Sequence, residues 1–374
     1  MLPFDQIDLT AYKADFLPLL RTLTEIPAPT GQEERRGDFC RRWLEEAGCS
    51  GVYTDSAGNV IWPHRCGEHD DAIVIMAHLD TVFPDQSITV RAEGDRLYAP
   101  GIGDDTANLA ALLLAARYVA QHDCAFPCGV YFVADVGEEG EGNLRGCRQF
   151  FADHSNIREF IGLDGQLGRY TVCPIGSRRY RVTVRTPGGH SFHDFGTPNA
   201  IERLSGLVQD LYRYPVPTRA RTTCNVGKIT GGTSVNSIAQ EAEMLWEFRS
   251  KAMDCLEEMD DAFRAAVDRC RAAGVTVEAE SIGIRPCMGT VDPVRQEELW
   301  QRCREALSCH FDGPLTPESG STDANIPWSL GIPSCTVGCV DTGGAHTRQE
   351  WINAVQAPEG LSFLLRLVLS YCND

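Results

Sequence analysis

Residues 73–83, IVIMAHLDTVF, form an unbroken apolar run that carries two polar side chains, His78 and Asp80, near its end. Runs of this length and composition are typical of strands buried on both faces of a parallel sheet. Side chains two residues apart in a strand point the same way, so His78 and Asp80 leave the core on one side. This stretch alone is compatible with a hydrogen-bonded core histidine and with a metal ligand beside an orienting carboxylate.

Similar runs stand on either side of this stretch. NVIWP and GVYFVADV read as short β-rich segments, and the helical stretch TANLAALLLAARYVAQ precedes the second of them. After residue 289 a helix, EELWQRCREAL, is followed by the buried run PSCTVGCV. Strands that alternate with helices predict an α/β fold with a central mixed, mostly parallel sheet flanked by helices.

The middle of the chain has a different sequence pattern. RRYRVTVRT alternates polar and apolar residues with period two, as a half-exposed strand does. The segments that follow predict the order β-α-β-β-α-β, which is typical of a compact, ferredoxin-like α+β domain. We therefore expect three parts, residues 1–176, 177–288 and 289–374, with the middle part inserted into a domain made by the other two.

Composition excludes some classes of function. The net charge of −18 is opposite to the basic surface that nucleic-acid binding requires. The 16 cysteines include no C-x-x-C pair, which favours small buried side chains in a reducing compartment over zinc ribbons or disulfides. The first residues lack the pattern of a signal peptide, and the most apolar helical stretch is too short to span a bilayer. We expect a cytoplasmic protein with no membrane partner.

The segment GIGDDTAN places Asp104 and Asp105 directly before the predicted helix. A helix-capping role accounts for one of these carboxylates and a metal ligand for the other. A dinucleotide-binding loop is an alternative, since Gly101 and Gly103 begin a G-x-G pattern. Its third glycine position is Thr106, however, and two carboxylates stand where a pyrophosphate needs amide donors. A dinucleotide-dependent oxidoreductase is therefore disfavoured.

Three further segments carry acidic residues or histidine. VADVGEEGEG has Glu138 and Glu139 after a hydrophobic strand, FIGLDGQ has Asp164 after another, and GGAHTRQEW places His346 in a glycine-rich loop. Adjacent carboxylates at the end of a buried strand repel each other unless a cation is bound, although a solvated loop is the alternative. Because ligands bind at the carboxyl edge of open α/β sheets, we expect these side chains to lie near His78.

The residues considered together are two histidines, His78 and His346, and four carboxylates, Asp104, Glu138, Glu139 and Asp164. Mixed imidazole and carboxylate ligands suit zinc or a related transition ion better than calcium or magnesium. Five ligands exceed the needs of one tetrahedral site that keeps an open position. They fit two metal ions that share a bridging carboxylate, which leaves Glu138 free to act as a base.

Taken in order, HLDTV, PGIGDD, GEEGEG, LDG, GGHS and GGAHT span nearly the whole chain. This series resembles the cocatalytic dizinc exopeptidases and amidohydrolases, the family of carboxypeptidase G, peptidase T, succinyl-diaminopimelate desuccinylase, acetylornithine deacetylase and aminoacylase. The resemblance implies a zinc-exopeptidase-like catalytic domain in residues 1–176 and 289–374. It also implies that residues 177–288 are a lid and dimerisation domain, so that the protein is a homodimer.

The resemblance further implies two zinc ions per subunit, with cobalt or manganese as alternatives. Their ligands would be His78 and Asp164 for one ion, Glu139 and His346 for the other, and Asp104 as the bridge. Asp80 would orient His78, and Glu138 would be the general base that takes a proton from water and passes it to the leaving amine.

In the inserted part, the resemblance assigns substrate contacts to three residues. His190, in TPGGHSFHDFG, would be offered across the dimer to the developing oxyanion. Asn236 and Arg249 would bind substrate, Arg249 as a clamp for a carboxylate, although a surface strand residue is the plainer interpretation of that arginine. One departure concerns Thr106, because many relatives have a lysine at this position.

The leading functional hypothesis is an exopeptidase that cleaves a peptide or amide bond of a small peptide. An N-acyl-amino-acid deacylase is the alternative on the same scaffold, because the two activities share the metal chemistry and differ in the pocket. A binding protein without catalytic activity is disfavoured because Glu138 and all five ligands are present. A cysteine protease that uses Cys335 or Cys339 with His346 is the least favoured hypothesis.

Overall fold

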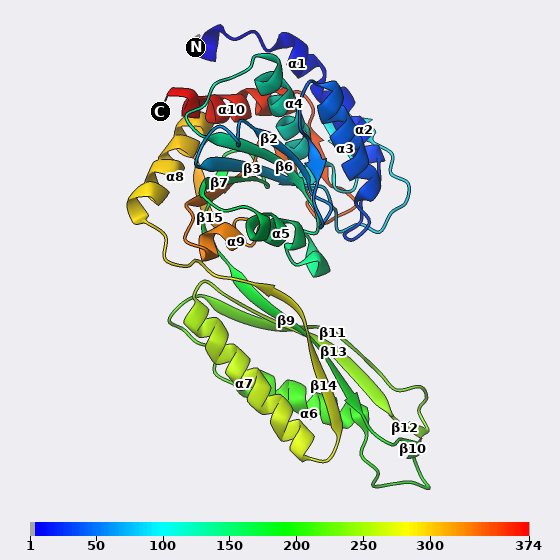
Figure 1. Cartoon of the computed structure of the whole chain (residues 1–374). Coiled ribbons are helices and arrows are strands. Elements are labelled where there is room, and N and C mark those ends of the chain that lie inside the picture. The colour runs from blue at the N-terminus through cyan, green and yellow to red at the C-terminus, as the bar shows by residue number, and fades with distance from the viewer. Residues whose placement is uncertain (1–3, 374) are drawn as a thin grey trace. The chain divides into compact units, whose positions relative to one another are not determined.

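The computed structural model describes residues 4–373, which form two compact units (Figure 1). The first joins the residues up to Pro174 with those from Gly289 onward, and the second is the insert Ile175–Met288. Each unit has a hydrophobic core of its own. The α/β fold class with an inserted α+β part is confirmed.

The first unit is built on an eight-stranded mixed sheet. Its order is β1 (Tyr53–Thr54), β2 (Val60–His64), β6 (Gly129–Asp135), β3 (Ala72–His78), β7 (Ile157–Leu163), β16 (Ser334–Val337), β8 (Arg169–Pro174) and β15 (Thr316–Gly320). The four central strands β6, β3, β7 and β16 are parallel. β3 is buried along its whole length, as its apolar run predicts, and His78 is its last residue.

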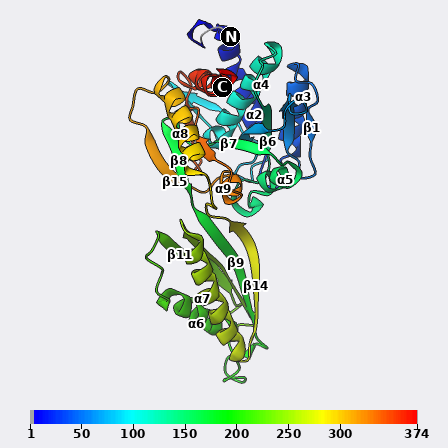
Figure 2. The same cartoon turned by 60° about the vertical axis from the view of Figure 1, so that its left-hand side comes forward.

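Helices cover both faces of this sheet. α4 (Asn108–Gln121) and α10 (Ala357–Ser370) lie on one face with α2 (Phe16–Glu25), and the short helices α5 (Arg145–Asp153) and α9 (Asn325–Ser329) lie on the other (Figures 1 and 2). Residues 109–116 of α4 are fully buried, as expected for a helix that is apolar on nearly every side. Three further α-helices complete this unit: α1 (Thr10–Ala14) packs on α2 and α10, α3 (Glu34–Glu46) on β2 and α4, and α8 (Pro293–Ser308) on β16 and α10.

A second, four-stranded sheet lies in the same unit. Its order is β17 (Thr342–Gly343), β18 (Trp351–Asn353), β5 (Arg96–Tyr98) and β4 (Arg91–Glu93), and all neighbours are antiparallel. The pairing of β18 with β5 brings the segment around residue 350 against the segment around residue 100.

The second unit has the element order that the sequence predicts. Four antiparallel strands are arranged as β11 (Thr222–Gly231), β13 (Glu241–Ser250), β9 (Gly176–Arg185) and β14 (Thr276–Arg285). The helices α6 (Ala200–Arg213) and α7 (Met253–Ala272) pack on one face of this sheet (Figure 1). A short ribbon of β10 (Gly189–His190) and β12 (Ser237–Ile238) stands beyond the end of β9.

Across residues 4–373, none of the helices is both long enough and apolar enough to cross a bilayer.

Candidate metal centre

The carboxyl ends of the central strands meet at one edge of the large sheet. His78 ends β3, where its cross-strand neighbour is Asp135 at the end of β6. Asp164 directly follows β7, and its backbone N–H donates to Val337 O of β16 at 3.1 Å. Burial of these parallel strands on both faces holds their ends in fixed register, so the polar residues that follow them converge.

Asp104 lies between two imidazoles. Its Oδ1 is 3.2 Å from His78 Nε2 and its Oδ2 is 3.1 Å from His346 Nε2. His346 Nε2 is also 2.9 Å from Glu139 Oε1. The backbone at His346 is left-handed, with φ of 63°, a conformation that is strained for a residue with a Cβ and is common at functional sites.

The structure brings together all five residues that the sequence suggests as metal ligands. His78, Asp104 and Glu139 each offer an atom within 4.8 Å of the others, and so do His78, Asp105 and Asp164. His346 reaches the first of these groups through its contacts with Asp104 and Glu139. The donor set of imidazoles and carboxylates fits a transition ion such as zinc.

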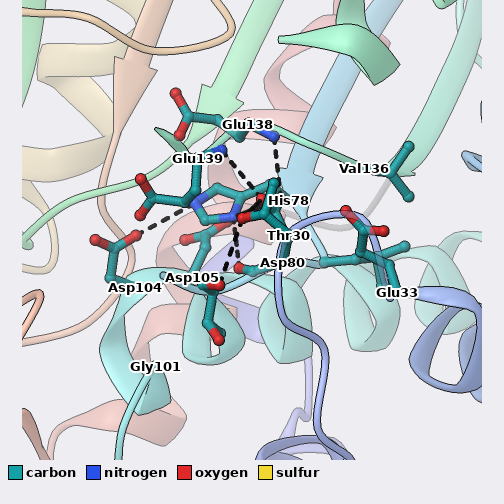
Figure 3. A network of polar contacts seen from close by, with 12 residues as sticks. Thr30, Glu33, His78, Asp80, Gly101, Asp104, Asp105, Val136, Glu138 and Glu139 are labelled. Carbon is teal, nitrogen blue, oxygen red and sulfur yellow. Dashed lines mark hydrogen bonds and ion pairs between the residues drawn. The ribbon is translucent and has the colours of Figure 1, made fainter. Parts of the chain in front are cut away.

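Asp80 organises the turn that follows β6. Its Oδ1 accepts the backbone N–H of Glu138 at 3.0 Å, and its Oδ2 accepts that of Glu139 at 3.1 Å (Figure 3). The Thr30 hydroxyl also donates to Oδ2, at 2.8 Å. The carboxylate is completely buried, and these three donors compensate its loss of solvation.

His78 is oriented mainly by the main chain of Asp80. Its Nδ1 lies 3.0 Å from the Asp80 carbonyl oxygen and 3.5 Å from the Asp80 carboxylate. A carbonyl can only accept, so Nδ1 carries a proton, and Nε2 is the nitrogen that could give up its own proton to bind a metal ion. Nε2 faces Asp104, where a metal ligand needs it.

Glu138 and Glu139 leave the turn on the same side as the Asp104 side chain (Figure 3). Both glutamates are buried. Only Glu139 is among the side chains within mutual ligand distance, which leaves Glu138 beside the cluster.

The site gathers more negative than positive charge. Burial raises the pKa of Asp164 well above its usual value, and the neighbouring Asp104 raises it further. Burial would lower the pKa of His78, but the surrounding carboxylates, Asp105 first, raise it well above its usual value. Contacts with Asp104 and Glu139 raise the pKa of His346 to about 11. Protons held this tightly among carboxylates mark a place where a bound cation would be favoured.

Asp105 does not cap α4, contrary to one of the two roles expected for the pair. The N-cap position of α4 is Ala107, which makes no side-chain cap bond. Asp105 instead accepts the backbone N–H of His78 at 3.1 Å and the side-chain amide of Asn108 at 2.6 Å. The contact with β3 takes precedence because the carboxylate is fully buried against that strand.

Two residues of the site region have no signal in the sequence. Glu350 is 1% exposed and accepts backbone N–H groups of the segment that carries Asp104. Arg36 of α3 is also 1% exposed and donates to Leu79 O at 2.8 Å and to the Thr106 hydroxyl at 3.3 Å. Both lie in polar stretches of sequence, where most charged side chains are solvated.

The three expected substrate contacts of the insert lie in two separate places within the second unit. His190 and Asn236 are neighbours, because β10 pairs with β12 and Ser191 N–H donates to Asn236 O at 3.0 Å. Arg249 lies near the other end of β13 and makes two 3.1 Å contacts with Glu247. His190 is exposed and its ring centroid is 4.7 Å from that of His193.

Comparisons with known proteins agree with this geometry. A family model described as peptidase family M20/M25/M40 matches residues 74–370. The chain is 24% identical over 355 residues to succinyl-diaminopimelate desuccinylase of Corynebacterium glutamicum, which covers 90% of this chain and 91% of that protein.

Solved structures of two other proteins share the fold. A tripeptidase from Staphylococcus aureus superimposes with a TM-score of 0.75 at 20% identity, covering 97% of this chain and 99% of the other. A dinuclear metal binding peptidase of the M20 family from Bacillus subtilis gives a TM-score of 0.66 at 16% identity, with 97% and 99% covered. The family model spans most of the chain, and the chain accordingly belongs to peptidase family M20/M25/M40, a family of metal-dependent hydrolases of peptide and amide bonds.

Proposed function

We propose that this chain is a dizinc exopeptidase that acts on small peptides. The ligands would be His78 and Asp164 for one ion, Glu139 and His346 for the other, and Asp104 between them. The observation that carries the proposal is the orientation of Asp104, whose two oxygens face different histidines at 3.2 and 3.1 Å. The likeness to a dinuclear metal binding peptidase supports two ions rather than one. The mixed donor set favours zinc, with cobalt or manganese as alternatives.

Bound zinc supplies Lewis-acid polarisation of the scissile carbonyl and of the attacking water. Glu138 then acts as the general base, accepting a proton from that water and delivering it to the leaving amine. The hydrogen bond from its backbone N–H to Asp80 keeps the glutamate at a fixed position beside the cluster.

Two of the alternative hypotheses meet physical objections. The backbone N–H groups of Gly101, Gly103 and Asp104 all donate to Glu350, so they are not free to bind a pyrophosphate. Cys335 and Cys339 are fully buried, and burial raises the pKa of each thiol well above its usual value. A thiol held protonated in the core is a poor nucleophile.

The proposal for the substrate is based on Arg249 and on the similarity to other peptidases and amide hydrolases. Arg249 is partly exposed and pairs with Glu247 along one strand. We propose that its guanidinium binds a terminal carboxylate of the substrate in place of that partner. The likeness to a tripeptidase favours small peptides, and the broad similarity to a desuccinylase supports an N-acyl-amino-acid deacylase as the second candidate.

We propose that the protein is a homodimer through the insert and that His190 serves the partner's site. Arg249 pairs with Ser177 at one end of the insert sheet, and Glu241 pairs with Arg185 at the other. The two pairs are eight positions apart along the strand, which is roughly 27 Å at the rise of a strand, and His190 lies beyond that far end. Arg249 and His190 of one subunit are therefore too far apart to contact the same small substrate.

The remaining features support a cytoplasmic enzyme that does not bind nucleic acid. All 16 cysteines are free, which suits a reducing compartment. The net charge of −18 disfavours binding to phosphate backbones.

Metal analysis combined with Glu138→Gln tests the catalytic proposal. We expect two zinc ions per chain in both the wild type and the variant, and loss of hydrolysis by at least about 100-fold in the variant because the base is absent. Glu141→Gln, which changes an exposed carboxylate of the same segment, is the matched control and should stay active. An active Glu138→Gln enzyme would remove the general base from the proposal. Dipeptides, tripeptides and N-acyl amino acids assayed in parallel distinguish the two candidate functions.

A mixing experiment tests the dimer. Glu138→Gln and His190→Ala proteins should each be nearly inactive alone. If His190 acts on the partner's site, random reassociation restores about a quarter of the wild-type activity, because half of the dimers are mixed and each has one intact site. If His190 acts within its own subunit, every site lacks one group and no activity returns.

A further inference from the structure

The Glu350 carboxylate accepts three backbone N–H groups from one short loop. Its Oε1 accepts Gly103 N–H at 2.7 Å and Asp104 N–H at 2.8 Å, and its Oε2 accepts Gly101 N–H at 3.1 Å. The side chain is 1% exposed, so these donors replace water around the charge. A carboxylate that accepts several backbone N–H bonds fixes the conformation of the segment that supplies them.

Glu350 belongs to the segment that carries the second histidine of the site. It lies four residues after His346, and its own N–H donates to Thr347 O at 3.2 Å. Its carbonyl oxygen accepts Ala99 N–H at 3.2 Å, which continues the pairing of β18 with β5. One side chain therefore connects the two segments that supply Asp104 and His346.

The loop has little freedom to move away from Glu350. A Cβ at Gly103 would overlap the Thr342 hydroxyl, and one at Gly101 would overlap the Thr81 side chain. The loop backbone is thus pressed between β17 and the segment after β3. Such close approach requires glycine at both positions. The Glu350 bonds then determine where the Asp104 side chain points.

We propose that Glu350 is a positioning residue that sets the spacing between Asp104 and His346, so that each oxygen of Asp104 faces a separate metal ion. This inference rests on the dinuclear site proposed above, but it concerns a residue that binds neither metal nor substrate. Because Asp104 would be shared by both ions, displacement of its loop should weaken both binding steps. Loss of a ligand that binds a single ion should instead weaken the binding of that ion alone.

Stepwise zinc affinities of the metal-free full-length protein, measured by competition with a chelator, test this inference. Glu350→Gln is nearly isosteric, but its amide group would direct a donor at one of the three N–H groups. We expect both dissociation constants to rise about tenfold, the lower end of the usual range for residues that support ligands. His346→Asn should raise only one of them strongly.

Glu159→Gln is the matched control. Glu159 is a buried glutamate of β7 that accepts the Tyr371 hydroxyl at 2.6 Å, far along the strand from Asp164. We expect this variant to lose stability without any change in zinc affinity. The visible spectrum of the cobalt-loaded protein should differ from that of the wild type in Glu350→Gln and match it in Glu159→Gln.

The outcomes separate the two proposals. If the wild type binds two ions and Glu350→Gln binds both with unchanged affinity and an unchanged cobalt spectrum, the positioning role is wrong. A change confined to one binding step contradicts the shared-ligand argument. If the wild type binds fewer than two ions, the dinuclear site itself fails, whatever Glu350 does.

Discussion

Asp80 uses each of its carboxylate oxygens for a different glutamate of the turn after β6. In Asp80→Asn one oxygen becomes an NH₂ group, which would face the backbone N–H of Glu138 or Glu139. We expect kcat to fall by at least about tenfold, because the turn that carries the base shifts. Steady-state kinetics with small peptides checks this.

Thr30→Val is the control for that prediction. It removes one donor to Asp80 and leaves both backbone contacts in place. We expect a loss of stability of about 1 kcal/mol with little change in kcat. An Asp80→Asn enzyme as active as Thr30→Val would show that the turn does not need the second oxygen.

The contact between Arg36 and Thr106 affects which side chains position 106 can hold without a loss of folding stability. The Arg36 guanidinium is buried and bonded to Ile26 O, Leu79 O and the Thr106 hydroxyl, and burial lowers its pKa to about 10. A lysine at position 106, the residue expected there from the family resemblance, would bring a second cation into this region. We expect Thr106→Lys to cost about 3 kcal/mol of folding stability beside Arg36 and clearly less in an Arg36→Met background.

Chemical denaturation of the four proteins in this double-mutant cycle checks the coupling. Strictly additive losses would mean that Arg36 and position 106 do not interact. Favourable coupling between Arg36→Met and Thr106→Lys would indicate that Arg36 occupies the electrostatic role of the missing lysine.

At the scale of elements, strand ends were the most predictable feature of the site region. An apolar run must be buried, and its first polar residue marks the point where the strand leaves the core. His78 and Asp164 lie at such points, and the two glutamates follow Asp135, the charged residue that ends β6, so their convergence follows from a parallel sheet. Glu350 and Arg36 were not predictable, because most of their partners are backbone groups, which have no signature in the sequence. The helix cap expected from one of Asp104 and Asp105 was wrong, because local capping is readable from sequence and the contact of Asp105 with β3 is not.

A pH dependence of folding stability is expected from His64, which ends β2 and is not part of the metal centre. Burial lowers the pKa of this ring, which lies 2.8 Å from Cys124 O and packs on Trp62 and Phe126. When the pKa of a histidine is lower in the folded state than in the unfolded state, folding stability is unaffected at pH values above the unfolded-state pKa, which is near 6.5. Stability is then lost as the pH falls below that value, because the unfolded chain binds the proton more readily.

Urea unfolding of the wild type and of His64→Gln at pH 7.5 and 5.5 tests this dependence. The glutamine amide nitrogen corresponds in reach to the histidine Nε2 that faces Cys124 O, and it does not titrate. We expect the wild type to lose more stability between the two pH values than the variant does. Equal losses would mean that His64 does not contribute to the acid sensitivity.

At the scale of the whole molecule, the insert has the properties of an independent domain. Its core is separate from that of the first unit, and its first and last strands, β9 and β14, pair with each other. Ser177 and Arg285 are cross-strand partners, so the two ends of the insert are adjacent. The order of its elements was predictable because each strand and helix has a clear period of its own.

We therefore expect a fragment of residues 175–288 to fold by itself. Circular dichroism should show mixed helix and strand content, and heating should give one cooperative transition. A fragment without a cooperative transition would mean that the insert depends on the rest of the chain for its stability.

The contacts of Glu350 have a consequence for how the protein is made. Its partners Gly101, Gly103 and Asp104 precede it by 249, 247 and 246 residues. During synthesis the loop around Asp104 leaves the ribosome long before the segment that holds it, and at 5–20 residues per second that delay is on the order of 10 to 50 seconds. Three of the four central strands, β6, β7 and β16, and the whole insert are made within this interval. The metal centre is therefore completed only after the segment that carries His346 and Glu350 has been made.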